Sequence, residues 1–355
     1  MNILWIGKSG KPNAWYHIHP YVKSKKTKRI IVVRQEQIAR NIDDKKLKFI
    51  YFKNSSYLNE LWNYFWTGQK VLIKNKFDLI VSYSLVPWGV ISWLLAKIHN
   101  KKIVLGLIGS DFNKNVKNGP LSPILRYILK RTDIITVTGN QMHNELKDLI
   151  GCENRIFILP HCLPDSLILK NDRFARKVDV LITVSDLTEN KRTIDIIKSV
   201  GLLKEKGINI KLLVVGKGPL EMVLKDYVAN NDLSNNITFL GYVDKIKEVY
   251  KKADIFIQAS LKEGLSICLV EAIGMELVPI VTNAGCEMDI ISNEKNGILF
   301  RKKDVLDLVE KIKFAMIEEN YNKLLNGVKA TKKNLTSEIA IKVVEDIQNQ
   351  IIKRS

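Results

Sequence analysis

Two glutamates eight residues apart stand at the start of a predicted helix, where they could hold a phosphorylated sugar. Glu263 and Glu271 follow the short β-branched run Ile255–Gln258, and a helix is expected to begin between them. Backbone amides and the positive dipole end of a helix start attract phosphate. Carboxylates accept hydrogen bonds from sugar or ribose hydroxyls. The alternative interpretation makes Glu263 a helix-capping carboxylate and Glu271 a solvated helix residue.

A glycine pair after another predicted strand could bring the backbone close to the same ligand. The run Lys211–Val215 ends in Gly216-Lys217-Gly218-Pro219. Gly216 and Gly218 lack the Cβ atoms that would keep a base or phosphate away, and Pro219 is typical of a first helical position. A tight turn that binds nothing produces the same pattern, so the pair alone indicates either a binding loop or a turn.

Short β-branched runs alternate with helical patterns along the chain, which predicts parallel strands joined by helical crossovers and therefore an α/β fold class. In the first half, strands are expected at residues 2–6, 29–33, 48–52, 78–82, 102–107 and 134–137. In the second half, they are expected at residues 178–184, 211–215, 237–240, 255–258, 279–282 and 297–300. Two tandem Rossmann-like units follow from this order.

The chain of 355 residues has the length of two domains. Pro160 and Pro164 interrupt regular structure, and the polar stretch 170–177 follows them. Ligands bind at the carboxyl ends of parallel strands, so two such domains are expected to face each other across a cleft. Helices are expected from Asp304 to the end, as part of the second domain. The predicted domains are residues 1–169 and 170–355.

Positive charge and tryptophan are concentrated in the first half. Residues 1–150 hold 25 Lys and Arg against 9 Asp and Glu, net +16, whereas residues 151–355 hold 31 against 28, net +3. All six tryptophans lie between Trp5 and Trp93. This combination suits an anionic membrane surface, nucleic acid or a solvated basic face. Charge alone does not separate the three.

Several classes of site and segment are not expected. Four cysteines are too few and too irregularly spaced for a disulfide framework or a metal knuckle. The start MNILWIGKSG is typical of a first buried strand and not of a secretory signal, so we expect a cytoplasmic protein. The most apolar stretch, residues 81–95, is shorter than a bilayer span. His17 and His19 have no nearby ligand cluster and the chain contains no D-x-D, so no metal is expected.

A resemblance to the family-four retaining glycosyltransferases (glycosyl transferases group 1) rests on their E-x7-E signature. It is carried here by Glu263-Gly264-Leu265-Ser266-Ile267-Cys268-Leu269-Val270-Glu271-Ala272 and the following Leu277-Val278-Pro279-Ile280-Val281. The resemblance covers most of residues 178–300 and is weaker over the first half. It implies the GT-B fold, with two Rossmann-like domains facing across a cleft and a nucleotide sugar bound mostly by the second.

Carried over residue by residue, the resemblance implies a donor site. Glu271 would bind the donor ribose and Glu263 the donor sugar, while Leu265 and Ser266 would offer amides to the diphosphate. Lys191 would neutralise charge on the leaving group. The predicted catalytic residues are Lys191, Glu263 and Asp111, the last of which is equally explained as a turn residue. The predicted donor-binding residues are Gly216, Gly218, Lys191, Arg192, Glu263, Gly264, Leu265, Ser266 and Glu271.

Five positions depart from the family pattern. Asp186 stands where an Arg usually lies beside the diphosphate, and its carboxylate would repel that charge, so Arg192 is expected to replace the missing cation. Ile108 stands where a His is common, and His161-Cys162 where Asn-Gly is frequent. Glu276 occupies a usual Gly position, which we interpret as a surface change.

The resemblance implies that a sugar moves, with retention, from a nucleotide-diphosphate donor to a hydroxyl of a glycan or lipid-linked acceptor in bacterial cell-surface polysaccharide or lipopolysaccharide synthesis. Front-face displacement, in which the leaving diphosphate accepts the acceptor proton, requires no covalent nucleophile and no cofactor. The alternative is a non-catalytic partner of the same fold with a degraded donor site, which Asp186 favours.

The basic, Trp-rich first domain is expected to bind the acceptor and to contact the anionic inner face of the cell membrane. Residues 21–34 are the predicted lipid contacts, through Lys23, Lys25, Lys26, Lys28, Arg29 and Arg34. No recognised nucleic-acid motif accompanies the charge, so nucleic acid is not an expected partner.

Overall fold

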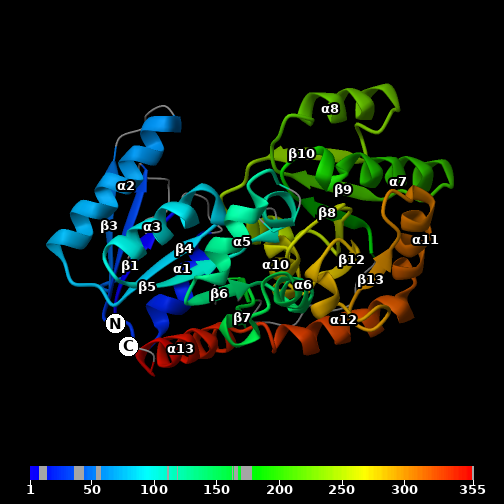
Figure 1. The fold of residues 1–355 in the computed structure, drawn as a ribbon. Coiled ribbons are helices and arrows are strands. Elements are labelled where there is room, and N and C mark those ends of the chain that lie inside the picture. The colour runs from blue at the N-terminus through cyan, green and yellow to red at the C-terminus, as the bar shows by residue number, and fades with distance from the viewer. Residues whose placement is uncertain are drawn as a thin grey trace. The chain divides into compact units, whose positions relative to one another are not determined.

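The computed structural model describes residues 1–7, 14–35, 44–52, 57–109, 112–117, 119–161, 163, 167–168 and 178–353. The chain forms two compact units, residues 1–162 with 337–355, and residues 163–336. Each unit is built around one parallel β-sheet (Figure 1). The predicted α/β class with two Rossmann-like units is confirmed.

The sheet of the first unit has the strand order β3-β2-β1-β4-β5-β6-β7. Its interior strand β1 is almost wholly buried because helices cover both faces of a parallel sheet. The strands are β1 (Asn2–Ile6), β2 (Arg29–Gln35), β3 (Leu47–Phe52), β4 (Leu79–Tyr83), β5 (Lys102–Gly106), β6 (Ile134–Val137) and β7 (Ile156–Ile158).

The helices of the first unit divide between the two faces of this sheet. Four of them join strands that advance in one direction across the sheet, so right-handed crossovers place them on the same face. They are α2 (Tyr57–Lys74), α3 (Val90–Ile98), α5 (Ser122–Lys130) and α6 (Asn140–Ile150). The other face is covered by α1 (Ala14–Lys23) and α13 (Ser337–Lys353), which pack against each other.

The C-terminal helix α13 belongs to the first unit, which corrects its predicted place in the second. Its apolar side chains, such as Ala340, Val344 and Ile347, are buried in the core that also contains the α1 and β1 side chains. The buried Gln348 accepts a hydrogen bond from Ser24 Oγ at 2.6 Å and donates one to Thr27 Oγ1 at 2.9 Å. A 3.6-residue apolar repeat predicts such a helix but does not say which sheet it covers.

The sheet of the second unit has the order β10-β9-β8-β11-β12-β13. Its strands are β8 (Val180–Val184), β9 (Lys211–Val215), β10 (Ile237–Gly241), β11 (Ile255–Gln258), β12 (Val278–Thr282) and β13 (Ile298–Phe300). From β8 the chain adds β9 and β10 on one side and β11 to β13 on the other. The order therefore reverses between β8 and β11, the place where open α/β sheets bind ligands.

Helices on both faces of this second sheet complete its core. They are α7 (Thr193–Glu205), α8 (Glu221–Asn230), α9 (Ile246–Tyr250), α10 (Ile267–Gly274), α11 (Val305–Met316) and α12 (Glu318–Lys332). The expected strands are all present, with ends shifted by at most two residues, whereas the three-residue β7 was not predicted. Within the described ranges, no helix is long and apolar enough to cross a membrane.

Candidate functional site

The loops that follow β8 and β11 are fastened to each other at the reversal point of the second sheet. Asn190 Nδ2 donates to the Lys262 carbonyl at 2.8 Å, and the Lys262 amide donates to Asn190 Oδ1 at 3.1 Å. The Leu261 amide donates to the Asn190 carbonyl at 2.8 Å. Sequence reasoning missed Asn190, whose only signal is its position next to Lys191. This clamp fixes the spacing of the charged residues that flank it.

The clamp brings the predicted Lys191 and Glu263 into direct contact. Lys191 Nζ donates to Glu263 Oε1 as an ion pair, and Ser260 Oγ donates to the same oxygen at 2.9 Å. The Glu263 amide donates to the Ala284 carbonyl at 2.9 Å, which ties this loop to the end of β12. An anion that approached Lys191 would compete with a carboxylate already in place.

Ser266 caps helix α10 beside this pair. Its backbone is extended, and its Oγ accepts from the Leu269 amide at 3.4 Å. The helix begins at Ile267, so the alternative in which Glu263 caps it is wrong. First-turn amides have no acceptor within a helix and attract an anion. The predicted diphosphate-binding segment, Gly264 to Ser266, leads directly into this helix start.

Glu271 lies on α10 and is 8% exposed, so the alternative of a solvated helix residue is also wrong. The hydroxyl of the buried Tyr250 lies 3.1 Å from Glu271 Oε2 and donates to it. Tyr250, from α9, carries no signal in the sequence that connects it with Glu271. The carboxylate is held in place and keeps further acceptor capacity for a hydroxyl.

The charged groups of this region act electrostatically on the thiol of Cys268. Burial raises the pKa of Cys268, and the carboxylates of Glu271, Glu263 and Asp186 raise it further, whereas Lys191 lowers it. Asp186, the departure from the family pattern, therefore lies within electrostatic range of the same site. The thiol stays protonated at neutral pH.

Arg192, the cation expected to replace the one that Asp186 removes, is paired with Asp195 in this structure. Its Nε donates to Asp195 Oδ2 at 2.9 Å and its Nη2 to Asp195 Oδ1 at 2.6 Å. Asp195 is buried at the start of α7, and this two-point contact raises the pKa of Arg192. Most of the guanidinium charge is therefore compensated within its own helix.

The glycine pair is explained by backbone packing between the loops after β8 and β9. A Cβ on Gly216 would overlap the Ser185 carbonyl, and one on Gly218 would overlap the Leu187 backbone. Gly216 has a φ of 129°, which side chains rarely adopt. The Leu187 amide donates to the Lys217 carbonyl at 3.0 Å. Donor contact by these glycines stays a prediction.

A buried carboxyl group that the sequence analysis did not consider lies next to Glu263. Glu287 is inaccessible to solvent, and Gln258 Nε2 donates to its Oε1 at 2.9 Å. Burial raises the pKa of Glu287 to about 7, and the charge of Glu263 contributes to the same shift. Gln258 is the last residue of β11, and the loop that carries Ser260 and Glu263 follows it.

Glu276 is not the surface residue that the sequence analysis expected. It is fully buried, has a φ of 58° and pairs with Lys332 Nζ of α12 at 2.5 Å. The left-handed backbone explains why glycine suits this position. The carboxylate is tolerated here because Lys332 compensates its charge.

The structure describes only some of the residues that the sequence analysis singled out in the first unit. Asp111 lies outside the described residues. His17 stacks on Tyr83 with ring centroids 4.3 Å apart and meets His161 at 5.1 Å. Burial lowers the pKa of His17 well below its usual value, and His161 lowers it further. Across the described ranges, no three His, Cys, Asp or Glu residues form a group that could hold a metal ion.

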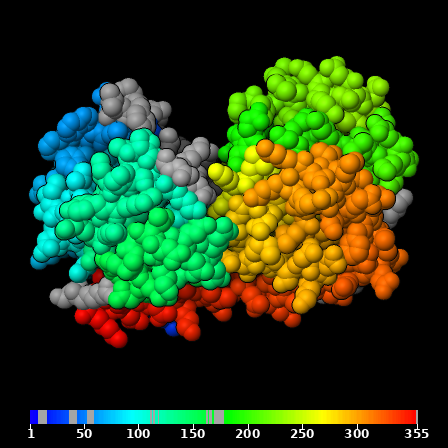
Figure 2. Space-filling view, turned by 45° about the vertical axis from the view of Figure 1, so that its right-hand side comes forward, coloured from blue at the N-terminus to red at the C-terminus, as the bar shows by residue number. Residues whose placement is uncertain are grey.

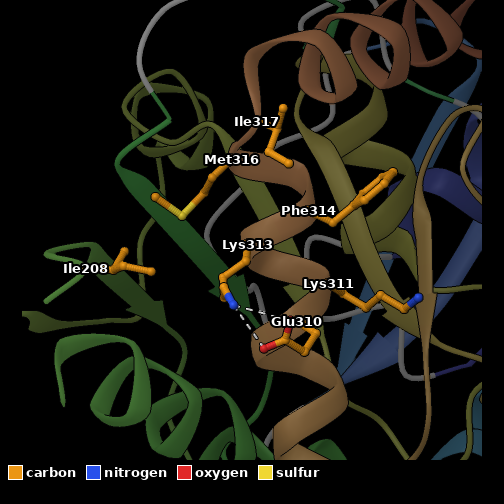
Figure 3. Close-up of a pocket in the computed structure, with 7 residues that line it drawn as sticks. All are labelled: Ile208, Glu310, Lys311, Lys313, Phe314, Met316 and Ile317. Atoms are coloured by element: carbon orange, nitrogen blue, oxygen red, sulfur yellow. Dashed lines mark hydrogen bonds and ion pairs between the residues drawn. The ribbon is translucent and has the colours of Figure 1, made fainter. Parts of the chain in front are cut away.

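A separate hollow of about 600 Å³ lies at the C-terminal end of α11 (Figure 3). Phe314, Met316 and Ile317 line it together with Ile208 and the Lys313–Glu310 ion pair. It contains none of the candidate site residues and is open to solvent.

Comparison with known proteins identifies the region that holds this site. Residues 167–334 match the family model described as glycosyl transferases group 1. The N-acetyl-alpha-D-glucosaminyl L-malate synthase of Bacillus anthracis is 22% identical over 251 residues, and the match covers 68% of this chain. It covers 66% of that protein, slightly less than two thirds of its length.

Two further similarities extend over more of the chain. A Campylobacter jejuni protein is 24% identical over 297 residues, which cover 80% of this chain and 79% of that protein. It is named GalNAc-alpha-(1->4)-GalNAc-alpha-(1->3)-diNAcBac-PP-undecaprenol alpha-1,4-N-acetyl-D-galactosaminyltransferase. The crystal structure of Anabaena HepE in complex with UDP matches with a TM-score of 0.80 at 14% identity, over 98% of this chain and 100% of that one. The match to the glycosyl transferases group 1 model spans residues 167–334, which hold all the predicted donor-binding residues.

Proposed function

We propose that this chain is a glycosyltransferase that moves a sugar from a nucleotide-diphosphate sugar to a hydroxyl of a glycan or lipid-linked acceptor. The observation that carries the proposal is the gathering of Lys191, Glu263 and Glu271 around the start of α10, at the reversal point of the second sheet. The match of residues 167–334 to the glycosyl transferases group 1 model supports the same reaction class.

In the proposed donor complex, Glu271 accepts hydrogen bonds from the ribose, held in orientation by Tyr250. The diphosphate lies at the amides that lead into α10, where the helix dipole favours negative charge. Lys191 then turns from Glu263 to the diphosphate, and Glu263 is released to accept a hydroxyl of the donor sugar. HepE, a protein of similar fold, was crystallised with UDP.

The proposed reaction retains the anomeric configuration. The bond from the anomeric carbon to the leaving diphosphate oxygen breaks, a bond to the acceptor oxygen forms on the same face, and the acceptor proton passes to the diphosphate. Lys191 and the helix-start amides stabilise the charge that develops on the leaving group. This chemistry requires no covalent nucleophile, and we propose no metal or other cofactor.

The pathway and place of action belong to the same proposal. We assign the chain to bacterial cell-surface polysaccharide or lipopolysaccharide synthesis, on the cytoplasmic side of the membrane and in peripheral contact with anionic lipid. The name of the Campylobacter jejuni relative includes an undecaprenol-linked substrate, which supports a lipid-linked acceptor. The net charge of +16 over residues 1–150 supports contact with an anionic surface.

The test is release of a nucleoside diphosphate from a panel of nucleotide sugars, in the presence of bacterial lipid extract, measured by mass spectrometry. We expect one donor to be consumed by the wild type and not by Lys191→Ala or Glu271→Ala. Lys198→Ala, an exposed lysine of α7, is the matched control and should keep the activity. No release and no binding of any donor would favour the non-catalytic partner.

A further inference from the structure

The first unit presents an outer surface on which large apolar side chains are exposed among basic ones. We name the exposed apolar side chains of α2, α3 and α5 the aromatic face. It consists of Trp62, Trp66, Ile73, Leu94, Ile98, Leu121, Ile124 and Tyr127, of which Leu121 is the residue that precedes α5. Each is between 43% and 75% exposed. Exposed apolar patches of this kind mark contact with a partner.

On α2 the exposed apolar residues form one stripe. Trp62, Trp66 and Ile73 are 60%, 54% and 75% exposed, and at about 100° per residue they lie within an arc of about 40°. The two indoles stack with centroids 6.3 Å apart. Lys70 and Lys74, both exposed, lie beside the stripe. An apolar stripe on the solvent side of a helix, flanked by lysines, is typical of helices that lie in a membrane interface.

The neighbouring helices α3 and α5 continue this surface. The rings of Trp93 and Tyr127 meet edge to face with centroids 6.4 Å apart, which joins α3 to α5. Lys97 lies over the Trp93 ring at 5.6 Å, and Arg131 lies over the Tyr127 ring at 4.7 Å. In Figure 2 the surface of the first unit passes from the light blue of α2 through the cyan of α3 to the blue-green of α5.

The charge on these helices has one sign. Residues 57–76, 90–102 and 119–131 contain nine Lys and Arg, and Glu60 is their only acidic residue. Glu60 is buried, so it does not reduce the positive charge at the surface. A second copy of this chain would bring like charges together. Nucleic acid would pair with the basic groups but would leave the aliphatic Ile73, Leu94 and Ile98 without apolar contact.

We propose that the aromatic face is the surface that docks on an anionic lipid bilayer. Trp and Tyr prefer the headgroup level, and each Lys or Arg near an anionic surface is attracted by it. This deepens the membrane contact of the proposed function by naming the surface. Its test requires no sugar donor, so it can fail while the proposed reaction stands.

This assignment moves the lipid contacts away from residues 21–34. Arg34 is buried, with its guanidinium over the rings of Phe49 and Tyr51. Lys23 pairs with Asp44 at 3.7 Å, and the Lys25 amide donates to Glu345 of α13 at 2.9 Å. Acidic side chains therefore face this segment, whereas the aromatic face has none exposed on its helices.

The experiment is sedimentation of the full chain with vesicles of phosphatidylcholine, with and without phosphatidylglycerol. The wild type should bind the anionic vesicles and release as salt rises to about 0.5 M. Trp62→Ser with Trp66→Ser should bind at least about tenfold more weakly. Lys70→Gln with Lys74→Gln should bind about thirtyfold more weakly at low salt.

The matched control is Met222→Ser with Val223→Ser, which removes two exposed apolar residues from α8 of the second unit and should leave binding unchanged. Circular dichroism checks that each variant is folded. Wild-type protein that ignores anionic vesicles, or tryptophan variants that bind as well as the wild type, would overturn the proposal. So would association of two copies, or capture of RNA, that is lost in the same tryptophan variants while vesicle binding persists.

Discussion

The buried Glu287 makes the stability of the second unit depend on pH in a defined direction. Its pKa is about 7 in the folded chain, against an ordinary value of 4.5. Such an acid holds its proton more tightly when folded, so it contributes stability below pH 4.5 and loses it as the pH rises to 7. The gap of about 2.5 between the two values corresponds to about 3 kcal/mol in the free energy of unfolding.

Substitution Glu287→Gln removes this dependence, because the amide does not ionise and can still pair with Gln258. Among the described residues, no group donates a hydrogen bond of good geometry to Glu287 Oε2, and burial penalises the ionised carboxylate. Relative to the variant, the wild type should lose about 2.5 kcal/mol between about pH 5 and about pH 8. Asp289→Asn, an exposed acid of the same segment, should follow the wild-type profile.

Urea unfolding followed by far-UV circular dichroism at a series of pH values measures this difference. Tryptophan fluorescence is unsuitable because all six tryptophans lie in the first unit. Fluorescence therefore follows the unfolding of the first unit alone, and this provides an internal reference for the unfolding of the second unit. If the difference between wild type and Glu287→Gln stayed constant from about pH 5 to about pH 8, the reasoning would be refuted.

Two further predictions concern the packing around the site. Lys332→Met removes the ion-pair partner Lys332 from the carboxylate of the buried Glu276, so urea unfolding should show a loss of about 3–5 kcal/mol, which Glu276→Gly in the same chain should largely restore. A loss that the second substitution fails to restore would contradict the pairing. Gly285→Ala places a Cβ against the Glu263 carbonyl and should cost about 1–3 kcal/mol and weaken nucleotide binding. The control Gly201→Ala, within α7, should instead stabilise the chain by about 0.5–1 kcal/mol. Equal effects of Gly285→Ala and Gly201→Ala on the free energy of unfolding would contradict the steric role of Gly285.

The strands and the site loop could be predicted from the sequence because both depend on local signals. Buried parallel strands are nearly continuous β-branched runs, which is why even the short β6 has its expected bounds. Glu263 and Lys191 were predicted from a motif, and they meet because their strands β11 and β8 are neighbours. The motif identified the two residues, and the strand order brings them into contact.

What the sequence could not provide depends on tertiary contact. The apolar repeat of α13 fits either sheet, and only its contacts in the folded chain, such as Gln348 with Ser24, show which one it covers. Glu276 looks like a surface residue until its backbone conformation and its partner Lys332 are known. Arg192 looks like a free cation until Asp195 is seen to bind it.

The measurement that tests the proposed donor site most directly is thermal stabilisation by a panel of nucleoside diphosphates and nucleotide sugars. A ligand that binds only the folded chain raises the unfolding temperature. One nucleotide should stabilise the wild type and the Lys198→Ala control, and should lose its effect on Lys191→Ala and on Glu271→Ala. Stabilisation that survives in both site variants, or the lack of any stabilising nucleotide, would contradict a donor site built on Lys191, Glu263 and Glu271.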